Sequence, residues 1–352
     1  MTDQRVLDAA GKLFGRQQLR RVDLLVVQIP HRAILARTVP AALGKPRRTG
    51  VIGSGTTKLL LMRILSIQSS VAYGHVGNSA ATFPLQRLGH EVWPVITVHF
   101  SNHTGYGEWR GIVLDPAVIA DVIEGIADRG ALGLVDAVLT GYQGSPGVAD
   151  VVLSTVRRVR ELNPDAMYCC DPVMGDVGRG MFVLPGLPEL IRDTVVPTAD
   201  VVTPNLFELA FLAGVQVEAI DSIDTLLAAV AAVRALGPQT VLVTSVEGRG
   251  LGIGADEIAM VAVDVTGSYL VRTPRLPLTV NGAGDVTAAL FLAHLPAGIE
   301  VALARVASSV YGILAATDAA GSREILLVEA QSAIAEPDCE FVVGRLTGPA
   351  ES

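Results

Sequence analysis

Short apolar runs that alternate with helix-like segments restrict the fold of this 352-residue chain more than any other feature. Each run ends in polar or small residues. Six of them follow one another, namely "RILSIQS", "EVWPVITV", "DAVLTG", "AMYCCD", "DVVTPN" and "QTVLVTS". A strand followed by a helix, repeated along a chain, is typical of a mostly parallel sheet with helices on both faces. The sequence therefore predicts an α/β fold, a three-layer αβα sandwich around a central sheet.

The pattern also predicts how the chain is divided. Residues 1–61 are weakly patterned and carry eleven Lys or Arg against three Asp. We interpret them as an N-terminal extension produced by an over-long gene model, with the natural start near Met62. A genuine tail or an organelle-targeting peptide is the competing interpretation. Residues 62–345 contain no repeat or linker and predict one domain, in which "EIAMVAVD" and "GSYLVRTP" form a hairpin or sheet edge. Residues 346–352 are a C-terminal tail.

Composition excludes several classes of function. Residues 62–352 carry sixteen Arg, thirty-two acidic residues and no Lys, which excludes a GxxxxGK[ST] phosphate loop and argues against a nucleic-acid partner. No uncharged apolar run reaches the roughly 20 residues of a membrane helix. The N-terminus lacks a compact secretion signal, so we expect a cytoplasmic protein with no membrane partner. The three cysteines, which cannot make a disulfide framework and which we interpret as structural, are Cys169, Cys170 and Cys339.

Polar residues gather where the predicted strands end. In open α/β sheets, ligands bind beyond the carboxyl ends of the strands. The residues found there are Ser69, Thr104, Thr140 to Tyr142, Asp171, Thr203, Asn205, Glu208, Thr244 and Ser245. One polar strand end would carry little weight, but several together with a glycine-rich helix start favour a functional site.

The glycine-rich stretch is "NGAGD", residues 281–285, followed by an apolar helix pattern. A helix start leaves backbone N–H groups without partners and attracts anions. The N–H groups of Gly282, Ala283 and Gly284 can hold the developing negative charge of a transferred phosphoryl group, while Asp285 accepts a hydroxyl proton. The simpler alternative is that Asp285 only caps the helix or occupies its first turn.

Two more acids suit a metal ion that bridges phosphates. Asp171 and Glu208 carry hard oxygen ligands of the kind that Mg²⁺ prefers, directly or through water. Without lysine, metal and backbone must neutralise most of the phosphate charge, with help from an arginine such as Arg179. Each acid also has a simpler interpretation, since Asp171 precedes a proline and can cap a turn, and Glu208 can be a first-turn helix acid.

Residues 62 to about 345 resemble the pyridoxal kinases of the ribokinase-like superfamily. "NGAGD" alone indicates only a ribokinase-like kinase. Two longer stretches, "IQSSVAYGHVGNSAATFPLQRLG" (67–89) and "FSNHTGYGEWRG" (100–111), favour a vitamin B6 substrate. The other motifs that carry the resemblance are "CDPVMGD" (170–176) and "TPNLFE" (203–208).

The resemblance implies a ribokinase-like fold, a homodimer and ATP-dependent phosphorylation of the 5′-hydroxymethyl group of pyridoxal, pyridoxine and pyridoxamine. It also implies roles for the matching residues. Ser69 and Thr104 contact the polar substituents of the pyridine ring, Tyr142 packs on the ring, and Asp285 is the catalytic base. The residues implied for ATP are Asp171, Asp176, Asn205, Glu208, Thr244 and Ser245. Those implied for Mg²⁺ and a monovalent cation such as K⁺ are Asp171, Thr203 and Glu208.

Two positions depart from the family pattern, and other functions stay open. Phe182 stands where some relatives have a tyrosine, and Thr244 stands where some bacterial relatives have lysine. A hydroxymethylpyrimidine or hydroxymethylpyrimidine-phosphate kinase of thiamine synthesis is the alternative enzyme. A non-catalytic pyridoxal 5′-phosphate carrier is the alternative of another class, although a carrier has no use for a base at Asp285. A dinucleotide-dependent oxidoreductase is disfavoured because "GDVGRG" lacks the GxGxxG spacing.

Overall fold

A computed structural model of the protein describes residues 48–51 and 58–346. Most of the predicted N-terminal extension and the last six residues lie outside the described residues. Two short strands in the 1–61 segment are described, β1 (Arg48–Val51) and β2 (Lys58–Leu61), which pair antiparallel. The prediction that the natural chain starts near Met62 is not tested by them.

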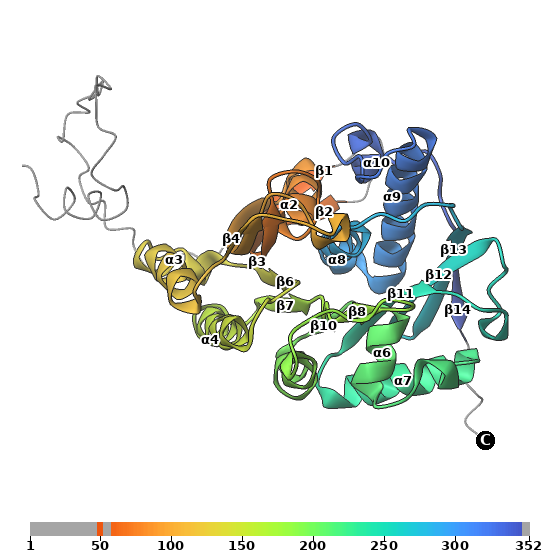
Figure 1. Ribbon diagram of the computed structural model, residues 1–352, viewed down its shortest axis with the longest axis horizontal. Coiled ribbons are helices and arrows are strands. Elements are labelled where there is room, and N and C mark those ends of the chain that lie inside the picture. Colours follow the sequence, from red (N-terminus) through yellow and green to blue (C-terminus); the bar gives the residue numbers. More distant parts are fainter. Residues whose placement is uncertain (1–47, 52–57, 347–352) are drawn as a thin grey trace, which may run out of the picture. The chain divides into compact units, whose positions relative to one another are not determined.

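A ten-stranded sheet forms the centre of the domain (Figure 1). In spatial order its strands are β14 (Val343–Leu346), β13 (Ser268–Pro274), β12 (Glu257–Val263), β11 (Thr240–Val246), β10 (Val201–Val202), β7 (Met167–Cys170), β6 (Ala137–Thr140), β3 (Arg63–Val71), β4 (Glu91–Phe100) and β5 (Gly111–Val113). The six strands from β11 to β4 are parallel, and the strands at both edges are antiparallel. The predicted mostly parallel sheet is confirmed, and so is the β12–β13 hairpin.

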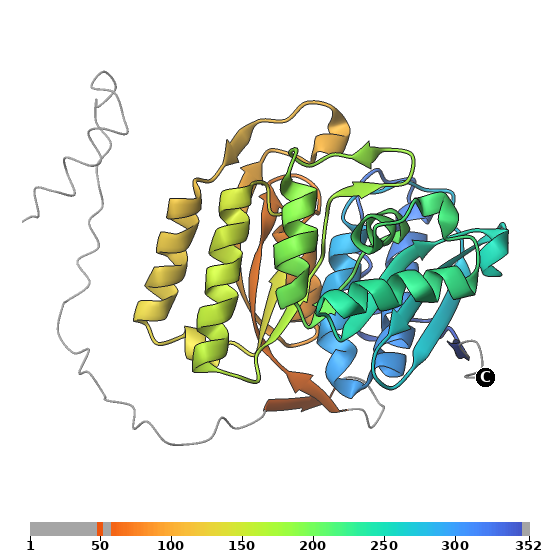
Figure 2. The same cartoon turned by 90° about the horizontal axis from the view of Figure 1, so that it is seen from below.

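Helices cover both faces of this sheet (Figures 1 and 2). One face carries α3 (Pro116–Asp128), α4 (Pro146–Leu162), α5 (Leu187–Leu190), α6 (Leu206–Ala213) and α7 (Ile223–Leu236). The other face carries α2 (Asn78–Arg87), α8 (Ala283–His294), α9 (Ile299–Ala319) and α10 (Gln331–Ala335). Short turns are η1 (Thr104–Tyr106), η2 (Leu132–Leu134), η3 (Ile191–Val195), η4 (Val196–Thr198), η5 (Val217–Ala219), η6 (Arg249–Leu251) and η7 (Leu295–Ala297), and a small hairpin joins β8 (Gly175–Asp176) to β9 (Gly180–Met181).

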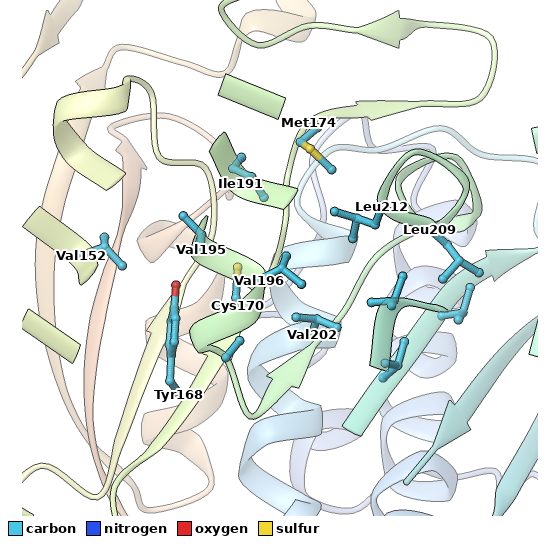
Figure 3. Packing of buried hydrophobic residues seen from close by; sticks show 14 of the residues in the cluster. Val152, Tyr168, Cys170, Met174, Ile191, Val195, Val196, Val202, Leu209 and Leu212 are labelled. Atoms are coloured by element: carbon cyan, nitrogen blue, oxygen red, sulfur yellow. The ribbon is translucent and has the colours of Figure 1, made fainter. Parts of the chain in front are cut away.

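Side-chain alternation along the strands builds two apolar cores. Successive residues of a strand point to opposite faces of the sheet. In β7, Tyr168 and Cys170 therefore pack on the α4 and α6 side, whereas Cys169 packs on the other side. Figure 3 shows Tyr168 and Cys170 beside Val195 and Val196, with Val152 of α4 and Leu209 and Leu212 of α6 among the other residues of this core. Cys169 and Cys170 are buried free thiols, and Cys339 is a third free thiol. This agrees with their interpretation as structural residues.

Helix α8 is buried on nearly all sides. It packs against both α2 and α9, and every residue from Val286 to His294 is buried. A helix that is apolar all round is stable only when other elements surround it. This packing fixes the helix start that carries "NGAGD".

Helix α9 is long and apolar enough to cross a membrane by length and composition alone, which the sequence analysis did not anticipate. Its buried residues belong to the apolar core on the α8 side of the sheet. Half of its most apolar window is buried inside the domain, as expected of a core helix in a globular protein.

Two buried histidines should lower the unfolding free energy of the protein as the pH falls below 6.5. His90, before β4, and His294, at the end of α8, each have a buried Nε2 with no hydrogen-bond partner among the described residues. Burial lowers the pKa of each to about 4, below the ordinary 6.5. The unfolded chain therefore binds more protons than the native state between these values, and this stabilising contribution is lost as pH falls from 6.5 through 4.

We expect removal of one histidine to make the protein relatively more stable in acid. When the pH falls from 7 to 5, the wild type should lose on the order of 2 kcal/mol more unfolding free energy than His294→Leu does. Urea unfolding at the two pH values measures this difference. The comparison with the wild type is essential because carboxyl groups with raised pKa values act in the opposite sense. An equal pH dependence in both proteins would contradict the assignment.

Candidate active site

Gly282 starts α8 in a backbone conformation that favours glycine. It is the N-cap, with φ of 90°, and a Cβ atom at this position would lie 1.9 Å from the carbonyl oxygen of His75. Apart from its chain neighbours and the backbone of α8 itself, no atom lies within 4 Å of the corresponding position at Gly284, so the helix start is open there. Asp285 is the third helical residue, and its carboxylate interacts with its own backbone N–H. It is a first-turn acid but not the N-cap.

The Asp285 carboxyl group faces the ends of two parallel strands. A Cβ atom on Gly141, just beyond β6, would lie 3.6 Å from Asp285 Oδ1. The backbone N–H of Gly77, which follows β3, interacts with the carboxylate. Burial raises the pKa of Asp285 to about 6, and the N–H groups of Gly77 and of Asp285 itself oppose this rise. A carboxylate with such a pKa is ionised at neutral pH and still a useful proton acceptor.

Asp171, directly after β7, is buried close to two other acids. Its carboxylate accepts a hydrogen bond from the hydroxyl group of Thr203 at 2.9 Å. Burial raises the pKa of Asp171 well above its ordinary value, and the charges of Glu208 and Asp285 raise it further. Three acidic groups from three separate elements are therefore brought together, as the sequence predicts for this edge of the sheet.

Glu208 has a structural task that the sequence analysis considered only as the simpler alternative. It forms a capping box with Asn205 at the start of α6, in which each side chain accepts the other's backbone N–H. Its other oxygen accepts N–H groups of Met174 at 2.8 Å and Gly175 at 3.4 Å. Burial raises the pKa of Glu208 to about 7, against the effect of these donors. The carboxylate thus links α6 to the loop that leads into β8.

The donor set fits a metal ion only in part. Within residues 48–51 and 58–346, no group of three or more His, Cys, Asp and Glu side chains is arranged to hold a metal. Asp171 keeps acceptor capacity beyond its bond to Thr203, whereas most of the Glu208 capacity is taken by backbone donors. Mg²⁺ commonly takes one or two carboxylates, with waters and substrate phosphates as its other ligands, and Asp171 suits that arrangement.

A cleft of about 1180 Å³ opens beside the start of α8. The predicted site residues that line it are Asp176, Asn205, Thr244, Ser245, Ala283 and Gly284. Its cationic lining includes Arg179 and Arg275. The sequence analysis missed its apolar wall, which includes Met260, Leu276, Leu278, Val310, Tyr311 and Leu314. Nothing in the sequence distinguishes these side chains from ordinary core residues.

The end of β11 is bent toward this cleft. The register between β11 and β12 shifts between Val243 and Val246, and Ser245 has φ of 54°, which is uncommon for a residue with a side chain. The backbone N–H of Thr244 donates to the carbonyl oxygen of Pro204 at 2.9 Å. The bulge thus interrupts regular pairing at Thr244 and Ser245, which line the cleft, before pairing resumes at Val246.

The residues predicted to contact pyridoxal lie on the other half of the sheet and outside the lining of the cleft. Ser69 lies in β3, Thr104 in the turn after β4, and Tyr142 just beyond β6. Gly77 approaches Ser69 so closely that a Cβ atom there would lie 2.6 Å from Ser69 Oγ. Since Gly77 also contacts Asp285, the start of α8 lies between this group and the cleft.

Comparisons with known proteins show the family to which the chain belongs. A family model described as phosphomethylpyrimidine kinase matches residues 90–320. The protein is similar to a pyridoxal kinase PdxY of Leifsonia xyli, with 55% identity over 81% of this chain and 100% of the relative, and to one of Rubrobacter xylanophilus, with 58% identity over 81% and 98%. The chain belongs to the pyridoxal kinase family.

A solved structure supports both the family and its fold. The pyridoxal kinase from Leishmania donovani, in complex with ADP and pyridoxamine, superposes with a TM-score of 0.74 at 29% identity, over 81% of this chain and all of that one. The expected ribokinase-like αβα sandwich of a pyridoxal kinase is confirmed.

The segment around the β8–β9 hairpin brings Arg179 and Phe182 together. The Arg179 guanidinium lies 5.2 Å from the centre of the Phe182 ring, and Arg179 lines the cleft. Phe182 has no hydroxyl group to offer at this position. Its ring instead supports the arginine through a cation–π contact.

Sequence reasoning also missed Glu324 near the predicted pyridoxal contacts. It lies between α9 and α10 and contacts His103 and Tyr106, which flank Thr104. It is separated from His103 by 221 positions. A single acid in "GSREILL" gives no sign of this contact, because only the folded chain brings the two segments together.

Proposed function

We propose that this member of the pyridoxal kinase family transfers the γ-phosphoryl group of ATP to the 5′-hydroxymethyl group of pyridoxal. Pyridoxine and pyridoxamine are further acceptors, and pyridoxal 5′-phosphate is the product formed from pyridoxal in vitamin B6 salvage. The observation that carries the proposal is the position of Asp285, between a cleft large enough for a nucleotide and the group formed by Ser69, Thr104 and Tyr142.

Asp285 is the catalytic base in this proposal. Its carboxylate takes the proton of the acceptor hydroxyl as the oxygen attacks the γ-phosphorus, and the bond to the ADP oxygen breaks. The N–H groups of Gly282, Ala283 and Gly284 hold the negative charge on the transferred group, aided by the positive end of the helix. Ser69 and Thr104 bind the polar ring substituents, and Tyr142 packs on the flat heterocycle.

The nucleotide occupies the cleft, where Asp176, Asn205, Thr244 and Ser245 contact it. Arg179 neutralises part of the phosphate charge, because the described domain has no lysine after residue 58. The family resemblance also implies that Asp171 and Glu208 belong to the ATP site, although neither side chain lines the cleft. Their role there is to hold the cations that accompany ATP.

Mg²⁺ and a monovalent cation, K⁺ in our proposal, are assigned to Asp171, Thr203 and Glu208. The bound metal supplies neutralisation of phosphate charge. Asp171 is the residue best suited to contact it, while Glu208 acts through water and by holding the loop at Met174. We also propose a cytoplasmic homodimer, as the family resemblance implies.

Substitution of Glu208 tests this part of the proposal. In Glu208→Gln, an amide N–H₂ replaces one acceptor oxygen and faces backbone donors, which should cost about 1–3 kcal/mol of unfolding free energy. The Mg²⁺ concentration for half-maximal turnover should also rise severalfold. Thermal unfolding and a Mg²⁺ titration measure the two effects, with exposed Glu336→Gln as control. Unchanged metal dependence would remove Glu208 from the cation site.

A hydroxymethylpyrimidine kinase is the second candidate, and the family model's description favours it. The test is an ATP-consumption assay on the full chain with Mg²⁺ and K⁺, comparing pyridoxal and hydroxymethylpyrimidine. We expect pyridoxal to be used at least about tenfold more efficiently. Preference for the pyrimidine would keep the role of Asp285 and overturn the ring contacts. Turnover of neither compound would favour the non-catalytic carrier.

A further inference from the structure

One carboxylate between α9 and α10 holds two loops that lie far from it in sequence. Glu324 Oε1 accepts a hydrogen bond from the hydroxyl group of Tyr106 at 2.6 Å and pairs with His103 Nε2 at 2.9 Å. Its Oε2 accepts the backbone N–H of His75 at 3.3 Å. The loops after β3 and β4 are therefore both tied to the segment that follows α9.

The surroundings of Glu324 are shaped for this contact. A Cβ atom on Gly74, which has φ of 85°, would lie 2.1 Å from Glu324 Oε2, so the carboxylate occupies space left by a glycine. Ser322 fixes the backbone, since its hydroxyl accepts the Glu324 N–H at 3.1 Å and donates to the Glu324 carbonyl at 2.7 Å. The side chains of Glu324 and His103 are only 13% and 10% exposed. The contact between these two side chains is therefore largely shielded from solvent.

Tyr106 is held by several groups at once. Its ring stacks with His103 at 4.7 Å between centroids, and the Arg323 guanidinium lies 4.8 Å from its centre. The hydrogen bond to Glu324 is the largest cause that raises the pKa of Tyr106 to about 12. The phenol therefore remains a hydrogen-bond donor throughout the neutral range.

These contacts fix the turn that carries Thr104. Thr104 lies between His103 and Tyr106 in η1. A Cβ atom on Gly105 would lie 2.7 Å from Asn281 Nδ2, so the turn rests directly against the start of "NGAGD". The same Cβ position on Gly105 would lie 2.9 Å from His103 Nδ1. This nitrogen has no hydrogen-bond partner among the described residues. The turn is thus set between Glu324 and the residue before Gly282.

We propose that Glu324 is a positioning residue that holds the Thr104 turn over the acceptor site. Through His103 and Tyr106, it determines where the Thr104 hydroxyl meets the vitamin. It touches neither the nucleotide cleft nor the reacting atoms. Loss of Glu324 therefore weakens binding of the acceptor while ATP binding persists. This inference rests on the proposed function.

The test compares Glu324→Ala, Glu324→Gln and the control Glu329→Ala, a change of an exposed acid five positions along the same segment. We expect Glu324→Ala to raise KM for pyridoxal about tenfold and KM for ATP less than about twofold. Glu324→Gln keeps one acceptor oxygen for His103 and Tyr106, so it should recover part of the loss. Glu329→Ala should match the wild type. Equal increases in both KM values would overturn the proposal.

Hydrogen–deuterium exchange gives a readout that does not depend on the substrate. Peptides covering residues 73–77 and 101–107 should exchange faster in Glu324→Ala than in the wild type, whereas peptides from α8 should be unchanged. Unchanged exchange in the turn would overturn the proposal even if pyridoxal proves not to be the substrate. Faster exchange with an unaltered KM for pyridoxal would overturn it too. Failure of the wild type to phosphorylate pyridoxal, with faster exchange in the variant, would instead reject only the proposed function.

Discussion

Asp285→Asn should lower kcat about 10³-fold and leave the affinity for ATP nearly unchanged. A positioned general base contributes roughly 10²- to 10⁴-fold to rate, and asparagine keeps the size of the side chain but accepts no proton. Asp285 does not line the nucleotide cleft, so its loss leaves the cleft walls in place. Steady-state kinetics and calorimetric titration with ATP measure the two quantities. Near-full turnover of the variant would show that another group is the base.

The pH profile gives an independent check on Asp285. Because burial raises its pKa to about 6, kcat/KM of the wild type should rise with pH and level off above about pH 6. The same shift means that ionisation of Asp285 lowers native stability as pH rises through 6, since the folded pKa exceeds the unfolded value. At pH 8 the asparagine variant should therefore unfold at an equal or higher temperature. The exposed change Asp165→Asn should alter neither property.

Gly282→Ala should damage both stability and turnover. The added Cβ atom would lie 1.9 Å from the His75 carbonyl oxygen, and φ of 90° is strained for alanine. We expect a loss of at least about 2 kcal/mol of unfolding free energy. The start of α8 must shift, which misplaces the N–H donors for the transferred group, so kcat should fall by about 10²-fold. Urea unfolding and steady-state kinetics measure both effects.

Gly284→Ala is the matched comparison on the same helix start. Beyond its chain neighbours and the backbone of α8, nothing lies within 4 Å of a Cβ atom there, and alanine favours a helix over glycine by about 1 kcal/mol. The variant should be as stable as the wild type or more stable. Any loss of turnover would then show that the added methyl group occupies space that the phosphates need. Equal destabilisation by both alanines would contradict a specific steric conflict at Gly282.

The fold could be predicted largely from local pattern. Apolar runs such as "EVWPVITV" and "QTVLVTS" became parallel strands because a helix that packs on the sheet precedes each of them, α2 before β4 and α7 before β11. The rule that ligands bind beyond strand ends then selected Asp171 and the polar end of β11. Glycine followed by a first-turn acid at Asp285 was sufficient to place the helix start. These are short-range signals, and they depend on spacing within a few residues.

Other features depend on contacts that no local pattern encodes. Glu324 meets His103 only because α9 and its following segment return beside the loop after β4. The apolar wall of the cleft, with Tyr311 and Leu314, has the composition of a core helix. The fixed hydrogen bonds of Glu208 depend on Met174, which lies 34 positions away. In each case the role of the residue depends on long-range contacts that form only in the folded chain.

The order of the strands separates two kinds of specificity. In chain order the ten-stranded sheet begins with β3, to which β4 is added on one side and β6 and then β7 on the other, so Ser69, Thr104 and Tyr142 come from one half of the sheet. The cleft with Thr244 and Ser245 comes from the other half and includes Ala283 and Gly284 at the start of α8. Choice of acceptor can therefore diverge through loops after β3, β4 and β6 while the use of the phosphoryl donor is retained. This division makes the fold a versatile starting point for new kinases of small hydroxymethyl compounds.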